Sequence, residues 1–207
     1  GGEINSNSVT GSGNVYGGAI YINNGNVEMS SGKINNNDAT STGQPAYGGA
    51  IYVNSGKFEI SNGELKNNTA ETSRDGKQAL GGGIYLSNKS FAQAEINGGT
   101  IEDNKAISTG TGNNYAYGGA VYASANSVVT LTSGTINKNT ASGSKGSYGA
   151  AIYLAEGATL NLSGNPTFGA DANANTVTLS EYSDKTNGGE YKYTDNKVRQ
   201  DIYRSEE

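Results

Sequence analysis

Apolar and polar residues alternate in short segments that recur at nearly regular intervals along the chain. The clearest segment is Tyr-Gly-Gly-Ala-Ile-Tyr-Val at Tyr47–Val53, and equivalent heptads begin at Tyr16, Leu80, Tyr117 and Tyr148. The spacings between the five heptads are 31, 33, 37 and 31 residues. A repeated unit whose length drifts in this way is typical of a solenoid, in which each repeat contacts mainly its neighbours.

Two further segments recur between the heptads, and both alternate as a strand with one buried face does. The first is Val27-Glu28-Met29, with counterparts at Phe58–Ile60, Ala94–Ile96, Val129–Leu131 and Leu160–Leu162. The second is Lys33-Ile34-Asn35, followed by Asn37 and Ala39, and it recurs as Leu65/Asn68/Ala70, Ile101/Asn104/Ala106 and Ile136/Asn139/Ala141. Three short strands per repeat predict one turn of a parallel β-helix. Because crossovers between parallel strands are nearly always right-handed, we expect an all-β, right-handed coil of about five to six turns.

Alternation also assigns the faces of the first strand. Two apolar columns should fill the core, since each buried aliphatic side chain contributes roughly 1.5–3 kcal/mol. They are Ile20, Ile51, Ile84, Val121 and Ile152, and two residues further Ile22, Val53, Leu86, Ala123 and Leu154. The residues between them must then point outward, namely Tyr21, Tyr52, Tyr85, Tyr122 and Tyr153. The small residues Ala19, Ala50, Gly83, Ala120 and Ala151 fall on the tyrosine face and should leave it open beside the rings.

The pattern changes after Leu162. Pro166-Thr167-Phe168 takes the place of a third strand, but no Asn follows at the expected distance, so residues 1–168 are interpreted as the repeats and 169–207 as a C-terminal part of the same domain. Within the insertion at 169–199, the alternation at 176–182 and 190–194 around a turn at 183–189 predicts a hairpin. Asp201-Ile202-Tyr203 resembles Ala-Ile-Tyr and should form the first strand of a sixth turn.

Composition restricts the classes of function. The chain has 32 Gly, 33% hydrophobic and 16% charged residues, which suits a narrow core filled turn by turn. The net charge is −5 with both signs interspersed, so no basic surface for nucleic acid is expected. No apolar run approaches the roughly 18 residues of a membrane span, and no leader is present, so this segment should not insert into a membrane. Gly1 falls within the last third of a repeat, so we expect a piece of a longer chain whose signal, anchor and neighbouring repeats lie outside it.

Cysteine and histidine are both absent. Their absence excludes disulfides, zinc-thiolate sites, Cys nucleophiles, Ser-His-Asp catalysis and His-ligated metals. We therefore expect neither a metal site nor a cofactor.

The repeats resemble those of the polymorphic outer-membrane proteins and related bacterial surface adhesins. Those repeats combine an aromatic or apolar residue, two variable positions, Asn and a small residue with a later Gly-Gly-Ala-Ile or Gly-Gly-Ala-Val. Leu65–Ala70 with Gly81-Gly82-Gly83-Ile84, and Ile101–Ala106 with Gly118-Gly119-Ala120-Val121, follow this pattern. The family's usual Phe is Ile or Leu here, and Tyr follows the glycine motif in every copy. The resemblance covers about residues 1–168 and implies a secreted or surface-displayed bacterial β-helix.

Three columns are candidates for function. Five outward tyrosines at the strand spacing would make an aromatic strip about 20 Å long, suited to a glycan or a host protein, although cross-strand stacking alone would also explain it. Glu28, Glu59 and Glu95, continued by Thr130 and Asn161, would repel unless a cation or lysine intervenes, and no Ca²⁺ loop accompanies them. A third column, the structural ladder Asn37, Asn68, Asn104 and Asn139, should link the turns through amide hydrogen bonds.

We therefore expect a non-catalytic adhesive or stalk module, with the tyrosines as the candidate ligand-binding residues. Two alternatives remain. One is a polysaccharide lyase or hydrolase, since such enzymes also adopt right-handed β-helices, but the first-strand face carries Tyr and Ala without an acid, and the arginines are only Arg74, Arg199 and Arg204. The other is a passive spacer. Ice binding ranks last because the threonines do not stack regularly.

Overall fold

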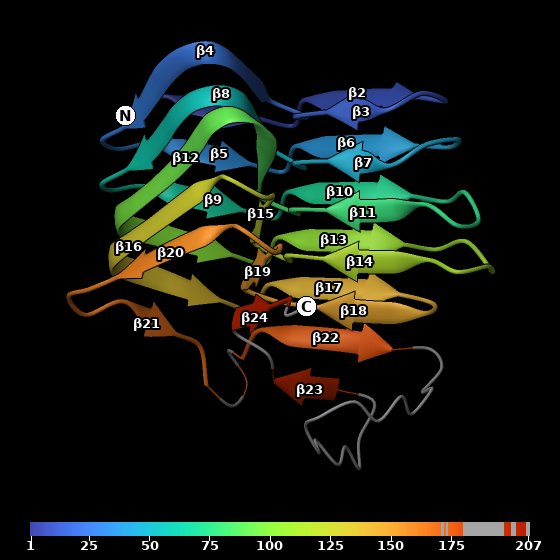
Figure 1. Cartoon of the computed structure of the whole chain (residues 1–207). Coiled ribbons are helices and arrows are strands. Elements are labelled where there is room, and N and C mark those ends of the chain that lie inside the picture. The colour runs from blue at the N-terminus through green and yellow to red at the C-terminus, as the bar shows by residue number, and fades with distance from the viewer. Residues whose placement is uncertain (171, 173, 180–196, 200–201, 206–207) are drawn as a thin grey trace.

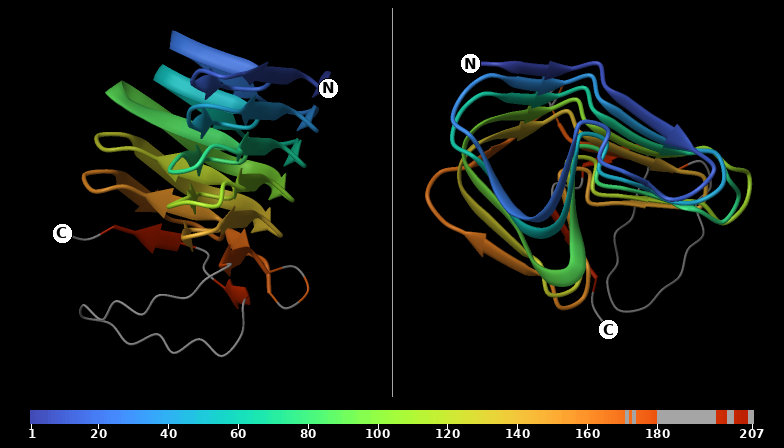
Figure 2. Two further views of the ribbon diagram at one scale, coloured as in Figure 1. Left: turned by 90° about the vertical axis from the view of Figure 1, so that its right-hand side faces the viewer. Right: turned by 90° about the horizontal axis from the view of Figure 1, so that it is seen from above.

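The computed structural model describes residues 1–170, 172, 174–179, 197–199 and 202–205. The described chain is all-β, without an α-helix, and its parallel sheets stack as a solenoid of about five turns (Figure 1). Seen from above in Figure 2, the chain runs clockwise as it descends from the N-terminus, so the coil is right-handed. The fold predicted from the repeats is confirmed.

The largest sheet wraps around the body of the solenoid and has 12 strands. Along its main path lie β1 (Glu3–Asn5), β5 (Lys33–Asn35), β9 (Glu64–Lys66), β12 (Ile84–Glu102), β15 (Val121–Ala123), β19 (Ile152–Leu154) and β24 (Ile202–Arg204). The remaining strands are β4 (Ile20–Met29), β8 (Ile51–Ile60), β16 (Val128–Asn137), β20 (Thr159–Leu162) and β21 (Thr167–Phe168). In β4, β8 and β12 the first two predicted strands of a repeat are continuous around a bulged corner.

Two smaller sheets form an arm that projects from one corner of the body, as Figure 2 shows. One contains β2 (Ser8–Gly11), β6 (Asp38–Ser41), β10 (Thr69–Thr72), β13 (Lys105–Ser108), β17 (Thr140–Gly143), β22 (Thr176–Leu179) and β23 (Lys197–Arg199). The other contains β3 (Val15–Tyr16), β7 (Ala46–Tyr47), β11 (Gln78–Leu80), β14 (Tyr115–Tyr117) and β18 (Gly146–Tyr148). The arm was not predicted, because its short strands of small and polar residues have the composition of turns.

The body and the arm have different cores. The predicted Ile, Val and Leu columns fill the body, where Ile51, Ile84, Val121 and Ile152 are fully buried. Between the arm sheets the core consists of alanines, namely Ala79, Ala106, Ala116, Ala141 and Ala150. Because alanine reaches only one methyl group beyond the backbone, the arm stays thin and contributes little burial of its own.

The small residues after the glycines do not lie as predicted. Ala50, Ala120 and Ala151 are fully buried and belong to the body core rather than to the tyrosine face. A Cβ on Gly83 would likewise meet the Leu65 side chain. The prediction extended strict alternation through these positions. Gly48 and its equivalents have positive φ, so the chain bends before the strand begins and the alternation restarts there.

The C-terminal part only partly matches the prediction. Thr176–Leu179 is a strand, but it pairs in parallel with β17 and so continues the arm into a sixth turn. Its antiparallel partner is Lys197–Arg199, and the predicted hairpin strand at 190–194 lies outside the described residues. β24 pairs in parallel with β19, with Tyr203 opposite Tyr153, which is the arrangement expected of a sixth turn.

Candidate functional site

The regular geometry of the turns places one tyrosine per turn in a continuous stack on the body sheet. This body tyrosine column consists of Tyr21, Tyr52, Tyr85, Tyr122, Tyr153 and Tyr203. Neighbouring ring centroids are 5.0, 5.2, 5.1, 5.1 and 5.3 Å apart, and the rings are nearly parallel. The spacing follows from the strand separation of about 4.8 Å, because in-register parallel strands stack identical side chains.

A second stack comes from the arm strands that precede the glycines. This arm tyrosine column consists of Tyr16, Tyr47, Tyr117 and Tyr148, with Leu80 taking the place of a ring in the third turn. Its rings meet the body column edge to face, as between Tyr16 and Tyr52 or Tyr117 and Tyr153, where the centroids are 4.8 Å apart. We call the two columns together the tyrosine zipper, and it ties the arm to the body.

The zipper is far less exposed than the outward strip that the alternation predicted. Tyr21, at the end of the body column, is 51% exposed, but Tyr52 is 6% and Tyr153 9% exposed. Tyr85 and Tyr122 are half-buried. The rings do face away from the body core, but the arm packs over them. The prediction that the inner rings, such as those of Tyr52 and Tyr153, are exposed was therefore wrong. The sequence pattern had not indicated the arm that covers them.

Serine hydroxyls bind the phenol groups inside the zipper. Ser124 Oγ donates a hydrogen bond to the Tyr85 hydroxyl at 2.9 Å, and the side chains of Ser87 and Ser205 are hydrogen-bonded to the hydroxyls of Tyr52 and Tyr153. Burial raises the pKa of Tyr85 to about 12, and burial together with neighbouring tyrosines also raises the pKa values of Tyr117 and Tyr122. The phenols of Tyr85, Tyr117 and Tyr122 therefore stay protonated at physiological pH.

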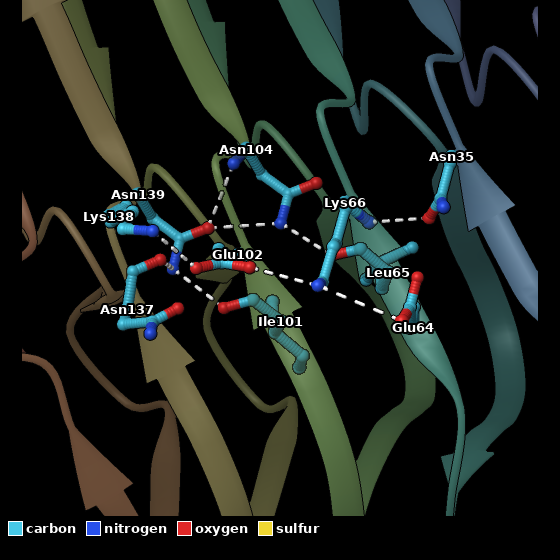
Figure 3. Close-up of polar contacts among 10 residues, drawn as sticks. All are labelled: Asn35, Glu64, Leu65, Lys66, Ile101, Glu102, Asn104, Asn137, Lys138 and Asn139. Carbon is cyan, nitrogen blue, oxygen red and sulfur yellow. Dashed lines mark hydrogen bonds and ion pairs between the residues drawn. The ribbon is translucent and has the colours of Figure 1, made fainter. Parts of the chain in front are cut away.

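A second feature of every turn is a buried amide ladder, part of which is drawn in Figure 3. Asn104 Nδ2 donates to Asn139 Oδ1 at 3.0 Å and to the Leu65 carbonyl at 2.9 Å, while its backbone N–H donates to the same Oδ1 at 3.0 Å. Asn37 and Asn68 repeat this pattern and are fully buried. Each amide thus satisfies backbone groups at a bend and links consecutive turns.

The ladder is longer than the four predicted asparagines. Asn7 Nδ2 donates to Asn37 Oδ1 at 2.9 Å, and Asn139 Nδ2 donates to Asn175 Oδ1 at 2.9 Å. The sequence pattern could have identified Asn7, because Asn7 follows Ile4 by three residues as Asn37 follows Ile34. Asn175 was missed because extra residues separate it from Phe168, so the fixed spacing does not apply.

Lys57 bridges two members of the acidic column on the body. Lys57 Nζ lies 2.9 Å from carboxylate oxygens of both Glu59 and Glu95, and Asn97 donates to Glu59 at 3.1 Å. These hydrogen bonds, the one from Lys57 foremost, lower the pKa of Glu59. In the register of the sheet Glu28 lies opposite Glu59, and Thr130 and Asn161 continue the column beyond Glu95. The lysine explains how the carboxylates tolerate one another.

A similar bridge lies beside the amide ladder (Figure 3). Glu102 accepts from Lys66 and Lys138, each at 2.9 Å, and its side chain is only 13% exposed. The bond from Lys138, followed by that from Lys66, lowers the pKa of Glu102. Asn137, opposite Glu102 on the next strand, has a buried Oδ1 without a hydrogen-bond partner among the described residues. Sequence reasoning did not single out this cluster.

Lysine side chains occupy both acidic clusters. The carboxylates of Glu59, Glu95 and Glu102 each lie 2.9 Å from a lysine Nζ. Within the described residues, no group of three or more Asp or Glu side chains is placed to hold a metal ion. No helix in that part of the chain is long and apolar enough to cross a membrane. What the arrangement can do is stack turns and present polar ladders.

In comparisons with known proteins, no family model matches the chain, and no curated protein or solved structure matches it significantly.

Proposed function

We propose that this chain is a non-catalytic stalk module of a secreted or cell-surface bacterial protein. The observation that carries the proposal is the continuity of its side-chain columns. The aliphatic, amide and tyrosine columns all run through consecutive turns of the described residues. Such a body gains length by adding turns, each stabilised by its neighbours. The resemblance of its repeats to those of surface adhesins supports the proposal of a position outside the cell.

The inner part of the tyrosine zipper supports a structural role rather than a binding role. Rings that a glycan or a partner protein could cover must be accessible, and Tyr52 and Tyr153 are nearly buried. The stacking and edge-to-face contacts among ten tyrosines instead join the arm to the body over its full height.

Adhesion through a limited surface is the second candidate, and it rests on Tyr21. Its ring is 51% exposed and continues the body column, so it offers an aromatic face with a polar edge to a sugar or a protein. A polysaccharide lyase or hydrolase is the less supported alternative, since the acids nearest to one another are bound by lysine.

The deciding experiment measures binding of the chain to a broad array of glycans and host-matrix proteins, beside a Tyr21→Ala variant and a Lys89→Ala control. Lys89 is also exposed but lies outside the zipper. No binding above background by any of the three proteins supports the stalk. If the unaltered chain and Lys89→Ala bind a ligand and Tyr21→Ala does not, the chain is an adhesive module and the stalk proposal is wrong. Reproducible turnover of any polysaccharide by purified protein would refute both.

A further inference from the structure

Several asparagines of this chain are followed directly by glycine, a pair with a chemistry of its own. The pairs are Asn24-Gly25, Asn62-Gly63, Asn97-Gly98 and Asn187-Gly188, of which the last lies outside the described residues. A glycine has no Cβ, so its backbone nitrogen can come close to the side-chain carbonyl carbon of the preceding asparagine. The three described pairs differ in where the asparagine amide lies, and this difference decides whether the two groups meet.

The pair at residues 62–63 brings the two groups together. Asn62 is exposed at the bend between β8 and β9, and the Gly63 N–H donates to its Oδ1 at 2.8 Å. Among the described residues this N–H makes no backbone hydrogen bond, whereas the N–H groups of Ser61 and Glu64 bond to carbonyls of the first turn at 3.1 and 3.0 Å. The stack therefore holds both ends of the bend and leaves the Gly63 nitrogen against the Asn62 side chain.

The bend requires the glycine but not the asparagine. Gly63 has φ of 106°, and a Cβ there would lie 2.6 Å from the end of the Met29 side chain. In the first and fourth turns the equivalent glycines follow Ser31 and Ser133 instead of asparagine. Serine therefore suits the same bend, and the contact between amide and nitrogen is particular to Asn62.

At Asn97 the neighbouring turns hold the amide. Its Nδ2 donates to Glu59 Oε1 at 3.1 Å, and its Oδ1 accepts from Thr132 Oγ1 at 2.8 Å. The residue is also half-buried in β12. Both polar atoms of this amide are thus engaged with other side chains, so the Gly98 nitrogen competes poorly for its carbonyl carbon.

Asn24 separates exposure from contact. Its side chain is exposed, as that of Asn62 is. Gly25, however, lies within β4 and pairs with Gly56, and in the described part of the chain no hydrogen bond joins its N–H to the Asn24 amide. Asn24 therefore serves as the comparison for a pair that solvent reaches but that the fold does not bring together.

We propose that Asn62 is a site of spontaneous modification, at which the Gly63 nitrogen attacks the side-chain amide. A bond forms between this nitrogen and Asn62 Cγ, the Cγ–Nδ2 bond breaks, and ammonia leaves, the proton of the Gly63 amide passing to it through solvent. Water then opens the resulting five-membered imide. Opening at Cγ gives aspartate, and opening at the main-chain carbonyl gives isoaspartate, which adds one backbone carbon to the bend. The inference is independent of the proposed stalk function.

The test follows the amides of the folded chain during incubation in mildly alkaline buffer, by mass spectrometry of proteolytic peptides. We expect Asn62 to lose its amide about tenfold faster than Asn24, and Asn97 to be slowest, because holding two reacting groups together accelerates their reaction. The same incubation in urea is the control, since unfolding removes the geometry. There the three pairs should react at similar rates, and Asn62 should react more slowly than in the folded chain.

A Asn62→Ser variant provides the matched protein, because serine occupies this place in two other turns. It should fold as the unaltered chain does and should lose the early release of ammonia. Two results would overturn the proposal. One is a rate at Asn24 equal to or above that at Asn62 in the folded chain, which would make exposure alone decisive. The other is a slower reaction of Asn62 in the folded chain than in urea, which would show that the bend protects the amide.

Discussion

At the scale of single residues, Phe91 at the corner of the third turn has a strained backbone conformation. Phe91 has φ of 50° and is 79% exposed, although a bulky L-residue rarely adopts this left-handed conformation. In the first turn the equivalent place, between the residues that pair with Ser55 and Gly56, is taken by Asn24 at φ 63°. Asparagine tolerates this conformation through local hydrogen bonding, whereas phenylalanine gains nothing from its exposed ring.

Phe91→Asn is therefore expected to stabilise the fold by about 1 kcal/mol, because the left-handed conformation costs an ordinary L-residue about that much. The change is measured by urea unfolding followed by circular dichroism. Phe91→Ala serves as the control and should have a much smaller effect, since alanine has no side-chain group to support positive φ. A destabilised Phe91→Asn protein would mean that the exposed ring packs on something the chain itself supplies.

The hydroxyls of the zipper follow a simple rule. The hydrogen-bonding serine lies two residues after the next tyrosine of the body column, as Ser124 does for Tyr85 and Ser205 for Tyr153. At the same place relative to Tyr122 stands Ala155. Ala155→Ser should add a hydrogen bond to the Tyr122 hydroxyl and stabilise the chain by about 1 kcal/mol.

This prediction is checked by a double-mutant cycle in urea. In a Tyr122→Phe background the gain from Ala155→Ser should vanish, because the phenylalanine ring has no hydroxyl. An equal gain in both backgrounds would show that the serine acts without Tyr122.

At the scale of the element, the tyrosine zipper makes the free energy of unfolding vary with pH in the alkaline range. The buried phenols have folded-state pKa values above the ordinary 10, with Tyr85 near 12. A group whose folded pKa is raised contributes stability in full below its unfolded pKa, and this contribution is lost as the pH rises toward the folded pKa. We expect the free energy of unfolding to stay constant to about pH 9.5 and to fall steeply between about pH 10 and 12.

Urea unfolding at a series of pH values measures this dependence, with tyrosinate absorbance as a second signal. A Tyr85→Phe variant should lose less stability over the same interval, because one titrating group is gone. A free energy of unfolding that is flat to pH 12 would be incompatible with buried phenols in the zipper.

At the scale of the whole molecule, each turn is stabilised mainly by the turns next to it, so position along the stack decides the effect of a substitution. Asn104→Ala removes bonds to Leu65 and Asn139 and leaves the Asn68 donors unpaired inside the protein. Asn7→Ala removes the bond to Asn37 in the turn below and the bond to the Asn5 carbonyl in its own turn. The two sites therefore form a matched pair of interior and terminal positions.

We expect Asn104→Ala to cost about 3 kcal/mol and Asn7→Ala about 1 kcal/mol or less, since each buried unpaired donor costs about 1–3 kcal/mol. Chemical denaturation of both variants gives the comparison. Equal losses would indicate that the ladder behaves as one cooperative unit rather than as a series of neighbouring contacts.

The linear sequence determined the path of the solenoid. Spacing of the heptads, the Ile and Leu columns and the asparagine ladder from Asn37 to Asn139 could all be recognised, because in a parallel stack identical residues must lie above one another and repetition reveals them directly. Asn175 was not recognised because an insertion changes its spacing from the preceding strand. It nevertheless accepts the same amide hydrogen bond, here from Asn139, as the other members of the ladder.

Only the tertiary structure decided how much of each column is accessible. Strand alternation tells which way the Tyr52 side chain points relative to its own sheet, but not what packs on the other side. The arm that covers it is built from short strands rich in alanine, serine and threonine, together with the arm tyrosines. These strands pair with the turns above and below and show no local apolar pattern of their own. Burial of the tyrosines, and with it the choice between a binding strip and a structural zipper, therefore depends on contacts between segments that local periodicity does not encode.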